Sequence, residues 1–545
     1  MTLFERILTA RGLTTRAARE AFLQPDYMAV KHDPFLLPDM EKAVARLKQA
    51  RDQGEKIVIY GDYDIDGLSA TALLLDAFGK FGFKDVDAFI PNRFVEGYGM
   101  TMGAVDKVYD MGADLIVTVD TGSLCHAEIE YASSLGIDVV VTDHHNVAET
   151  PPPSVAAVNP KFSGHTYPFR DLCGAGVAFK LVQALQTELD GLPDGYEKWL
   201  LDLVALGTVC DIVTLADENR ANVYWGLEVL KKQQRPGLKA LMTVAGIEPE
   251  RVNARHLGFG LGPRMNAAGR LETAQHALDM LVARDGLAAL EASEKLEELN
   301  VKRRIIQDAI FEEACVQAEQ LADDRVLVVS SDGWNHGVIG IVASKLVEKY
   351  KKPVFIIGER GEEATGSARS FGDFSAADAV RAADDIIIKG GGHGAAAGVT
   401  LGTEKIGDFR RRVNEFYDSL QLTSQERYLL PRADVEIDDF SEIDEELAAN
   451  LAKMEPFGNG NPEPVLKITR ASVLSMRRMG ADGQHVKLAL RDKNGKVLQM
   501  LAFNAPEEFF REPGDEVVAW FQPTVNEWQG VRTVEGRLLH IILLD

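Results

Sequence analysis

The sequence has 545 residues, of which 46% are hydrophobic, and its 83 acidic and 59 basic side chains give a formal net charge of −24. This length is too great for one hydrophobic core, so three or four globular domains are expected. The negative charge by itself argues against an extended surface for nucleic acid, although an average can hide a local basic patch.

The cysteines and the apolar runs indicate a cytoplasmic protein that has no membrane segment. The four cysteines form no C-x-x-C pair, which argues against a zinc site or a disulfide framework and suits a reducing compartment. The N-terminal stretch MTLFERILTARGLTTRAARE lacks the apolar core of a signal peptide, and no apolar run approaches the roughly eighteen residues of a membrane span.

Three segments in the first part of the chain share one pattern, in which a β-branched run ends in acidic residues and is followed by a helical stretch. They are KIVIYGDYDIDG, DLIVTVDTGS and DVVVTDHHNV. Strands that alternate with helices predict an α/β domain with a doubly wound parallel sheet. Ligands bind beyond the carboxyl ends of the strands in such sheets, so the acidic residues are expected to meet there.

A mainly helical region is expected after these strands. The apolar stretch WLLDLVALGTVCDIVTL predicts a buried helix that ends at Asp211, and residues 221–310 are predicted to form a helical connector. From Leu230 to Arg270 this connector has eight basic residues against Glu248 and Glu250. The basic segment is either a solvated helical face or the wall of a groove for a polyanion.

A second α/β unit and a β domain are predicted to follow. RVLVVSSDGWNHGVIGIVASKLVEKYKKPVFII has the pattern of a strand, a glycine-containing loop, a helix and a strand. GGGHGAAAG predicts a tight turn from a strand into a helix of small residues. From about residue 430, short alternating runs such as HVKLALRD predict a small barrel or sandwich, for which an oligonucleotide-binding (OB) fold is one candidate.

The aspartates Asp62, Asp64 and Asp66 in GDYDIDG indicate a metal site, because carboxylates this close repel one another unless a cation compensates them. An EF-hand loop is excluded, since its twelfth position requires Glu and holds Leu73, and since a strand precedes the motif. A haloacid-dehalogenase-type phosphatase is a weak alternative, because Asp66 stands where that family has Thr or Val.

The histidines of the Asp143-His144-His145 motif favour manganese, zinc or iron over an all-oxygen calcium site. With Asp62, Asp64, Asp66, Asp120 and Asp211 they offer more donors than one ion needs. Two ions that share a bridging carboxylate, roughly 3.5–4 Å apart, would use these donors and are suited to in-line attack at phosphorus.

These motifs resemble those of a known superfamily. GDYDIDG, VDTG, TDHH and the aspartate after the apolar helix are similar to the DHH phosphoesterases. The resemblance narrows to the RecJ family of bacterial exonucleases, which degrade single-stranded DNA from 5′ to 3′, and it covers nearly the whole chain. The motifs that narrow it are NRFVEGYG, LCGAGVAFKL, LGPRMNAAGRL, GWNHGVIGIVASKL, GSARS, GGGHGAAAG and EPFGNGNPEP.

The resemblance implies a domain order and a metal centre. The implied domains are a DHH catalytic domain (1–220), the helical connector with its basic segment (221–310), a DHH-associated substrate-binding domain (311–425) and an OB-like domain (426–545). Two Mn²⁺ or Mg²⁺ ions are expected to be held by Asp62, Asp64, Asp66, Asp120, His144 and Asp211. Asp120 is the candidate for the bridging ligand, and Asp120, His144 and His145 are the candidate catalytic residues, with His145 orienting water or the leaving group.

One departure leaves the division of ligands open. The wider superfamily often has a histidine ligand where this sequence has Tyr60, so the split of the three aspartates between the two ions is not fixed by the resemblance.

The resemblance also implies residues that contact the terminal phosphate and the DNA backbone. They are Arg93, Arg264, Asn266, Arg270, Ser367, Arg369, Gly391, Gly392 and His393. Guanidinium groups fork onto phosphate oxygens, and glycines let backbone N–H groups approach an anion. The alternative for each arginine is an ordinary salt bridge. A narrow groove between the two α/β domains would admit one strand and exclude duplex, and Arg470, Arg477, Arg478 and Lys487 of the barrel would extend it. Core packing is the favoured role for the barrel aromatics Trp520 and Phe521.

The expected function is therefore a metal-dependent exonuclease that degrades single-stranded DNA to mononucleotides in DNA repair and recombination. Single-strand-binding protein and a helicase are partners by resemblance alone. One alternative is an oligoribonucleotide or cyclic-dinucleotide phosphodiesterase, or a pyrophosphatase, of the same superfamily. The other is a DNA-binding scaffold with an inactive nuclease core, which the complete set of acidic positions disfavours.

Overall fold

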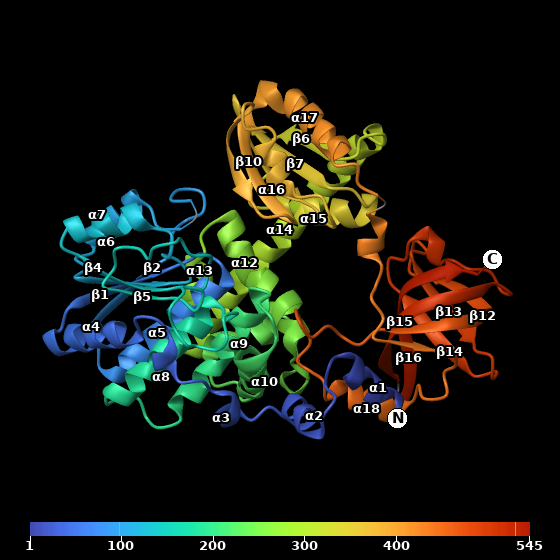
Figure 1. Ribbon diagram of the computed structural model, residues 1–545, viewed down its shortest axis with the longest axis horizontal. Helices are drawn as coiled ribbons and strands as arrows, with labels where there is room; N and C mark the ends of the chain where they lie inside the picture. Colours follow the sequence, from blue (N-terminus) through green and yellow to red (C-terminus); the bar gives the residue numbers. More distant parts are fainter. Residues whose placement is uncertain (98, 424, 529, 545) are drawn as a thin grey trace. The chain divides into compact units, whose positions relative to one another are not determined.

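The predicted strands of the first domain lie side by side in one parallel sheet. The computed structural model describes residues 1–97, 99–423, 425–528 and 530–544. All neighbouring strands of the sheet run parallel, in the order β2-β1-β3-β4-β5. Figure 1 shows this sheet with helices on both sides. The strands are β1 (Lys56–Gly61), β2 (Asp85–Phe89), β3 (Leu115–Val119), β4 (Asp138–Thr142) and β5 (Ala156–Val158). The predicted parallel sheet is confirmed.

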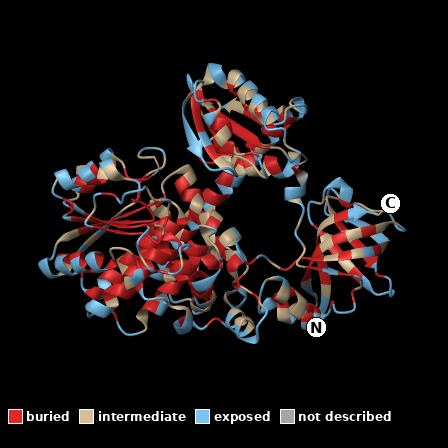
Figure 2. Ribbon diagram, in the orientation of Figure 1, coloured by how far each residue is buried: buried red, intermediate tan, exposed pale blue. Residues whose placement is uncertain are grey.

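Helices cover both faces of this sheet. On one face Val58 and Tyr60 of β1 pack in a core that includes α6 (Met102–Asp110) and α7 (His126–Ser134). The other face is covered by α4 (Met40–Gln53), α5 (Ile65–Phe81) and α8 (Gly174–Glu188). The central strands are therefore buried on both sides (Figure 2), which explains their continuous apolar runs.

The predicted buried helix is α9 (Leu201–Cys210), which packs against α5 and α8. Its first eight residues are buried, Asp202 among them, so the helix is covered on all sides, as expected for a helix inside a domain. Helices also fill the predicted connector, where a π-helical turn (His256–Leu261) leads into α12. The helices of this region are α10 (Asp217–Lys231), α11 (Pro236–Val244), α12 (Gly262–Leu271), α13 (Gln275–Val282) and α14 (Gly286–Gln320).

The second sheet is mixed, with the order β6-β7-β8-β10-β9. Only β6 and β7 pair parallel among these neighbours. One face packs on α15 (Ile339–Tyr350), and the other packs on α16 (Ala376–Arg381) and α17 (Ile406–Ser419). The strands are β6 (Leu327–Asp332), β7 (Val354–Arg360), β8 (Glu363–Arg369), β9 (Ile387–Gly392) and β10 (Ala396–Gly402).

The prediction of a small-residue helix in GGGHGAAAG is wrong. The segment forms the hairpin of β9 and β10, and β10 lies between β8 and β9 in the sheet. Alanine and glycine have low intrinsic strand preference, but two hydrogen-bonded neighbours outweigh that preference here.

The C-terminal strands form a closed barrel. Strand β12 pairs with β13 on one side and with β15 on the other, while β14 and β16 pair parallel. This is the five-stranded barrel predicted as OB-like. The strands are β12 (Leu466–Met479), β13 (His485–Arg491), β14 (Val497–Ala502), β15 (Glu516–Trp528) and β16 (Val531–Leu543), and the short strand β11 (Val435–Ile437) pairs parallel with the start of β12.

The N-terminal segment completes the core of this barrel domain, which the sequence did not indicate. The segment contains α1 (Leu3–Ala10), α2 (Arg16–Leu23) and α3 (Tyr27–Val30). Leu3, Ile7 and Leu8 are buried in one core cluster with barrel residues and with α18 (Glu445–Ala452). The two ends of the chain are thus joined by apolar burial, which is a non-local contact.

The chain divides into two compact units. One consists of residues 1–262, 278–290 and 431–545, and the other of residues 263–277 and 291–430. The four predicted domain boundaries stay predictions. Within the described part of the chain, no helix is both long enough and apolar enough to span a membrane.

Candidate metal centre and substrate-binding residues

The acidic motifs meet where the strand order of the first sheet reverses. Chain order changes direction between β1 and β3, which is the position where open α/β sheets bind ligands. Three clusters form at this edge, and in each the candidate ligand atoms lie within 4.8 Å of one another. The clusters are Asp62–Asp64–Asp120, Asp66–His144–Asp211 and Asp120–His144–His145. The structure therefore brings all the predicted metal and catalytic residues together.

The first turn of α5 fixes two of the aspartates. Asp64 is the N-cap of this helix, and its Oδ1 accepts from the backbone N–H of Asp66 at 2.9 Å and of Gly67 at 3.1 Å. Asp66 in turn accepts from the N–H groups of Gly174 and Ala175 at the start of α8. The positive end of α8 thus stabilises the charge on Asp66 and holds its carboxylate still.

Asp120 and His144 lie at the middle of the site. Asp120 has φ 61°, in the left-handed region, which aspartate adopts more readily than most residues. His144 Nε2 lies 3.0 Å from Asp120 Oδ1, 3.5 Å from Asp211 Oδ2 and 3.7 Å from Asp66 Oδ2. One imidazole nitrogen thus faces three carboxylates from three different elements.

Several polar atoms at the centre of the site make no hydrogen bond of good geometry, although His144 Nε2 and Asp120 Oδ1 lie within ion-pair distance of each other. They are Asp62 Oδ2, both carboxylate oxygens of Asp120 and His144 Nε2, all buried. Buried atoms of this kind are costly to leave unpaired, so a concentration of them marks a missing partner. Carboxylate oxygens with an imidazole nitrogen form a donor set that suits Mn²⁺, and Mg²⁺ takes the oxygen ligands. The residues present therefore fit divalent cations.

The protonation of the carboxylates leads to the same conclusion. Burial and then the neighbouring Asp64 raise the pKa of Asp62 and that of Asp66 to about 7. Burial and then Asp66 raise the pKa of Asp211 to about 8, and burial raises that of Asp120 well above its ordinary value. The site cannot hold all its negative charges without added positive charge, which a metal ion supplies.

Asp143 holds the two histidines in place. It belongs to the Asp143-His144-His145 motif, but the sequence alone offers no reason to assign this role to it. Its Oδ1 accepts from the backbone N–H groups of His144 and His145 and lies 2.9 Å from His145 Nδ1. Its Oδ2 accepts from the N–H of Ser123. Although burial opposes both shifts, this pairing holds the pKa of Asp143 below its ordinary value and raises that of His145 to about 9.

Tyr60, which stands where the wider superfamily often has a histidine, belongs to the hydrophobic core. Its side chain is fully buried beside Phe89, and its hydroxyl donates to the carbonyl of Gly99 at 3.1 Å. Position 60 thus adds no donor to the three clusters, and Asp62 with Asp64 forms a separate set from Asp66.

Arg93 is the one predicted phosphate-binding residue in the same compact unit as the metal centre. Its guanidinium lies 4.4 Å from the centre of the Tyr63 ring, and its Nε is buried without a hydrogen-bond partner. Its charge lowers the pKa of Asp62, although burial and Asp64 outweigh this effect. An anion at this place would pair with a donor that the protein leaves unused.

Five other predicted residues gather on the second sheet. Across three strands, Gly398 of β10 lies opposite Ser367 of β8 on one side and Gly391 of β9 on the other. Arg369 donates from Nη1 to Ser367 Oγ at 3.1 Å. Gly391, Gly392 and His393 are exposed, so the backbone of this hairpin is open to a ligand. A glycine row beside Ser367 and Arg369 can receive a phosphate group.

The arginines of the basic segment mostly have partners within the protein. Arg264 pairs with Glu297 at 2.5 Å, and Arg270 donates to the carbonyl of Gly337 at 2.8 Å. Asn266 is half-buried on α12. The role of Arg264, Asn266 and Arg270 in binding DNA stays a prediction.

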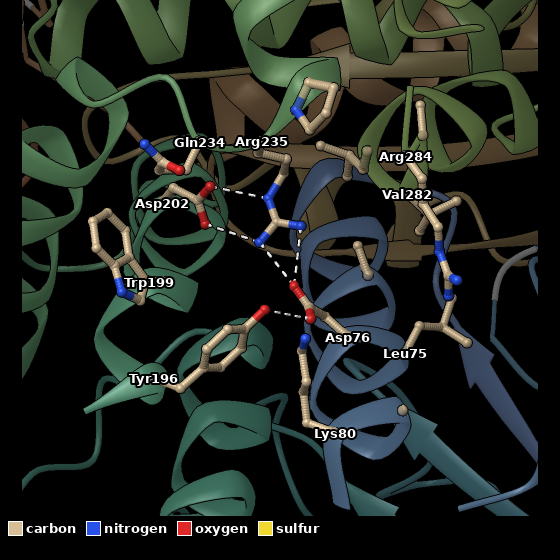
Figure 3. A pocket seen from close by; sticks show the side chains of 15 residues that line it. Leu75, Asp76, Lys80, Tyr196, Trp199, Asp202, Gln234, Arg235, Val282 and Arg284 are labelled. Atoms are coloured by element: carbon tan, nitrogen blue, oxygen red, sulfur yellow. Dashed lines mark hydrogen bonds and ion pairs between the residues drawn. The ribbon is translucent and has the colours of Figure 1, made fainter. Parts of the chain in front are cut away.

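Arg235 of the same segment forms ion pairs within the protein, which was the alternative to binding DNA. It lies in a hollow of about 680 Å³, where it pairs with Asp202 and Asp76 (Figure 3). The Tyr196 hydroxyl also donates to Asp76 at 2.9 Å. Arg235 therefore serves the fold, because its charge is matched by two carboxylates.

The basic residues of the barrel are likewise paired where the structure records a partner. Arg470 pairs with Glu516, Arg478 with Glu507 and Lys487 with Glu535. Phe521 is buried in the barrel core, while Trp520 is half-buried with Lys467 over its ring. The core role of Phe521 is confirmed, and an extension of the DNA track by the barrel stays a prediction.

Comparison with known proteins identifies the family. Family models match three parts of the chain: the N-terminal domain of the DHH family at residues 56–208, the DHHA1 domain at residues 323–419 and the RecJ OB domain at residues 433–540. A "Single-stranded-DNA-specific exonuclease RecJ" of Dickeya dadantii is 35% identical over 93% of this chain and 91% of its own length. The chain belongs to the RecJ family.

Other RecJ proteins support this membership over most of the chain. The RecJ of Bacillus subtilis is 39% identical over 96% of this chain, which spans 65% of that relative's length. The crystal structure of Thermus thermophilus RecJ in complex with Mn²⁺ superposes with a TM-score of 0.84 at 30% identity, covering 99% of this chain and 76% of the other. The same protein in complex with Mg²⁺ gives a TM-score of 0.77 at 28% identity. The RecJ family is a family of nucleases, and the crystal structures of its Thermus thermophilus member contain the two ions that the donor set favours.

Proposed function

We propose that this protein is a metal-dependent exonuclease that degrades single-stranded DNA from the 5′ end to mononucleotides. The observation that carries the proposal is the set of buried, unpaired carboxylate oxygens around Asp120 at the point where strand order reverses, in a chain of the RecJ family. Its setting is DNA repair and recombination in the cytoplasm.

The metal-binding residues in this proposal are Asp62, Asp64, Asp66, Asp120, His144 and Asp211. Two Mn²⁺ or Mg²⁺ ions held by these residues would supply positive charge next to the phosphodiester and would lower the pKa of water, which is the chemistry that in-line attack at phosphorus needs. Asp120 belongs to two of the three clusters, which supports it as the shared ligand. Asp143 and the start of α8 keep the ligands oriented, as supporting residues do at metal sites.

His145 has a separate role, because it combines a raised pKa with partial exposure. The side chain is 37% exposed, and its pairing with Asp143 raises its pKa to about 9 although burial opposes the shift. It is therefore placed to orient water or to give a proton to the departing oxygen. Asp143 fixes which ring nitrogen faces the site, since it holds Nδ1.

In this proposal, the residues that recognise the 5′ end of the single strand are Arg93, Ser367, Arg369 and the hairpin of Gly391, Gly392 and His393. Their guanidinium, hydroxyl and backbone N–H groups suit a 5′-terminal phosphate. Arg264, Asn266 and Arg270 would contact the following phosphates. A groove that admits one strand would exclude duplex by its width. Single-strand-binding protein and a helicase are the partners proposed to deliver the substrate.

The test is degradation of 5′-phosphorylated, 3′-labelled single-stranded and duplex DNA with Mn²⁺, Mg²⁺ or a chelator. We expect metal-dependent release of mononucleotides from the single strand, slow reaction on duplex and a loss of about 1000-fold in Asp120→Ala, the upper range for removing one group that stabilises the transition state. Asp110→Ala, on an exposed part of α6, is the matched control.

Intact DNA binding without degradation, unchanged by Asp120→Ala, would overturn the exonuclease proposal. Cleavage of short RNA or cyclic dinucleotides in its place would favour the related phosphodiesterases. Binding of DNA without any hydrolysis would favour a scaffold.

A further inference from the structure

A loop of the barrel domain reaches the segment that follows the candidate ligand Asp211. In the loop Glu455–Pro462, the side-chain amide of Asn459 donates to the carbonyl of Ile212 at 2.8 Å. The backbone carbonyl of Asn459 accepts from the N–H of Leu215, also at 2.8 Å. One residue of the loop therefore holds both ends of the segment 212–215.

The loop needs glycine to come this close. A Cβ atom at Gly458 would lie 2.7 Å from Leu215 Cδ1, and one at Gly460 would lie 2.6 Å from Thr214 Cγ2. Gly460 also has φ 76°, which disfavours other residues. The sequence FGNGNP thus fits the close approach of this loop to the segment after Asp211.

The segment that Asn459 holds contains an unfavourable backbone conformation. Helix α9 ends at Cys210, and Ile212 has φ 60°, at the position after a helix where glycine or asparagine usually stands. A β-branched residue is strained there. The Ile212 side chain is 69% exposed, so packing contributes little to holding this conformation.

The loop itself is firmly anchored. The Arg220 guanidinium on α10 donates to the carbonyls of Met454, Glu455 and Pro456. The Asn461 side chain donates to the carbonyls of Met454 and Pro456 and accepts from Arg11 at 2.8 Å. Arg220 stays charged although burial lowers its pKa to about 10. The loop is thus a fixed support for the strained segment.

We infer that Asn459 is a positioning residue for the metal centre, because it keeps Ile212 in the left-handed conformation and so sets the direction of Asp211. With Leu215 tied to the loop, a change of φ at Ile212 has to be absorbed on the other side, at Asp211. The inference rests on the proposed function, in which Asp211 holds a metal ion with Asp66 and His144. It gives the barrel domain a second role, in support of the metal centre.

The test compares full-length Asn459→Ala with the wild type by calorimetric titration with Mn²⁺ in the absence of DNA. We expect Mn²⁺ to bind about 10-fold more weakly, at the lower end of the loss seen when residues that support metal ligands are removed. The nuclease rate should recover at saturating Mn²⁺, and KM for DNA should not change. Asn494→Ala, in an exposed turn of the barrel, is the matched control and should bind Mn²⁺ like the wild type.

A second substitution separates positioning from general stability. Ile212→Gly in the Asn459→Ala background should restore most of the Mn²⁺ affinity, because glycine adopts the left-handed conformation without strain. If Asn459→Ala does not fold, Asn459→Asp carries the test, since it keeps the size and removes the donor.

Two results would overturn the inference. One is Mn²⁺ affinity equal to the wild type in the folded Asn459 variants, and the other is weaker DNA binding with unchanged Mn²⁺ affinity. Asp211→Asn distinguishes this failure from a failure of the proposed function. If that variant also binds Mn²⁺ like the wild type, the error lies in the assignment of Asp211 as a ligand.

Discussion

Helices α5 and α9 carry two pairs of aspartates, one toward each end, and the pairs have opposite environments. Asp66 at the start of α5 lies near Asp211, which follows α9, with His144 between them. Asp76, farther along α5, lies near Asp202 at the start of α9, with Arg235 between them (Figure 3). Among the described residues, only His144 lies within ion-pair distance of the first pair, whereas the second pair has an arginine of its own.

This difference distinguishes a site for a ligand from a structural ion pair. Arg235 lies 2.9 Å from Asp202 and 3.4 Å from Asp76, and these carboxylates raise its pKa although burial opposes the shift. At the other end, burial raises the pKa of Asp66 to about 7 and that of Asp211 to about 8. Buried acids without a fixed cation are typical of functional sites. The same residue type on the same helices thus serves two purposes.

The largest expected effect comes from the uncompensated pair. Asp211→Asn should lower the rate of single-strand degradation by about 1000-fold at fixed Mn²⁺, because a metal ligand is lost. In chelator its melting temperature should equal or exceed that of the wild type, since the variant removes a buried acid without a cation. Nuclease assays and thermal unfolding check this. A clear loss of stability in chelator would place Asp211 among the structural acids.

The compensated pair should behave in the opposite way. Asp202→Ala leaves Arg235 with one distant partner, so the free energy of unfolding should fall by about 3 kcal/mol. The activity per folded molecule should stay close to that of the wild type. Chemical denaturation together with the nuclease assay measures both quantities. Loss of activity in a folded Asp202→Ala protein would show that the two ends of α9 are not independent.

A glycine on α9 allows the uncompensated pair to form. A Cβ atom at Gly207 would clash with Asp66 Oδ1, so Gly207→Ala must displace that carboxylate. We expect Mn²⁺ affinity to fall about 10-fold, measured by calorimetry. Gly79→Ala on α5 is the matched control, because nothing lies within 4 Å of a Cβ there. Equal Mn²⁺ affinity in the two variants would contradict this role of Gly207.

The smallest expected effect is a dependence of stability on pH. In chelator, the pKa of Asp66 in the folded protein is about 7 and that of Asp211 is about 8, whereas the ordinary value for an aspartate is 3.8. Between pH 4 and pH 8 the folded state therefore binds more protons than the unfolded state, and stability falls as pH rises through this window. The melting temperature should drop by a few degrees between pH 5.5 and pH 8. Saturating Mn²⁺ or Asp211→Asn should reduce the slope, and an unchanged slope would argue against this origin.

Much of the candidate site could be predicted from local sequence patterns. The apolar runs before Asp62, Asp120 and Asp143 predict parallel strands, and parallel strands bring their carboxyl ends to one edge. Asp211 could be placed because an apolar helix precedes it. These patterns can be read from the sequence without a structure, because helix and strand geometry sets the spacing of apolar residues.

Other features depend on contacts that no local pattern encodes. The helix predicted after GGGH is strand β10, because pairing with β8 and β9 outweighs local preference. In the sequence, Arg235 cannot be distinguished from the other basic residues of its segment. Only the fold places Asp76 and Asp202 beside it. A charge has a partner only through tertiary structure, so the sequence could not separate the two roles.

The sequence by itself determined the strands, the acidic clusters at their ends and the family to which the chain belongs. Only the tertiary structure decided which aspartates have a cation of their own, that Asp143 orients the histidines and that α1 belongs to the barrel core. It also decided the contact of Asn459 with Ile212, which are 247 residues apart in the sequence. The physical reason is that periodicity and turn chemistry act over a few residues, whereas burial and charge pairing depend on which distant segments meet.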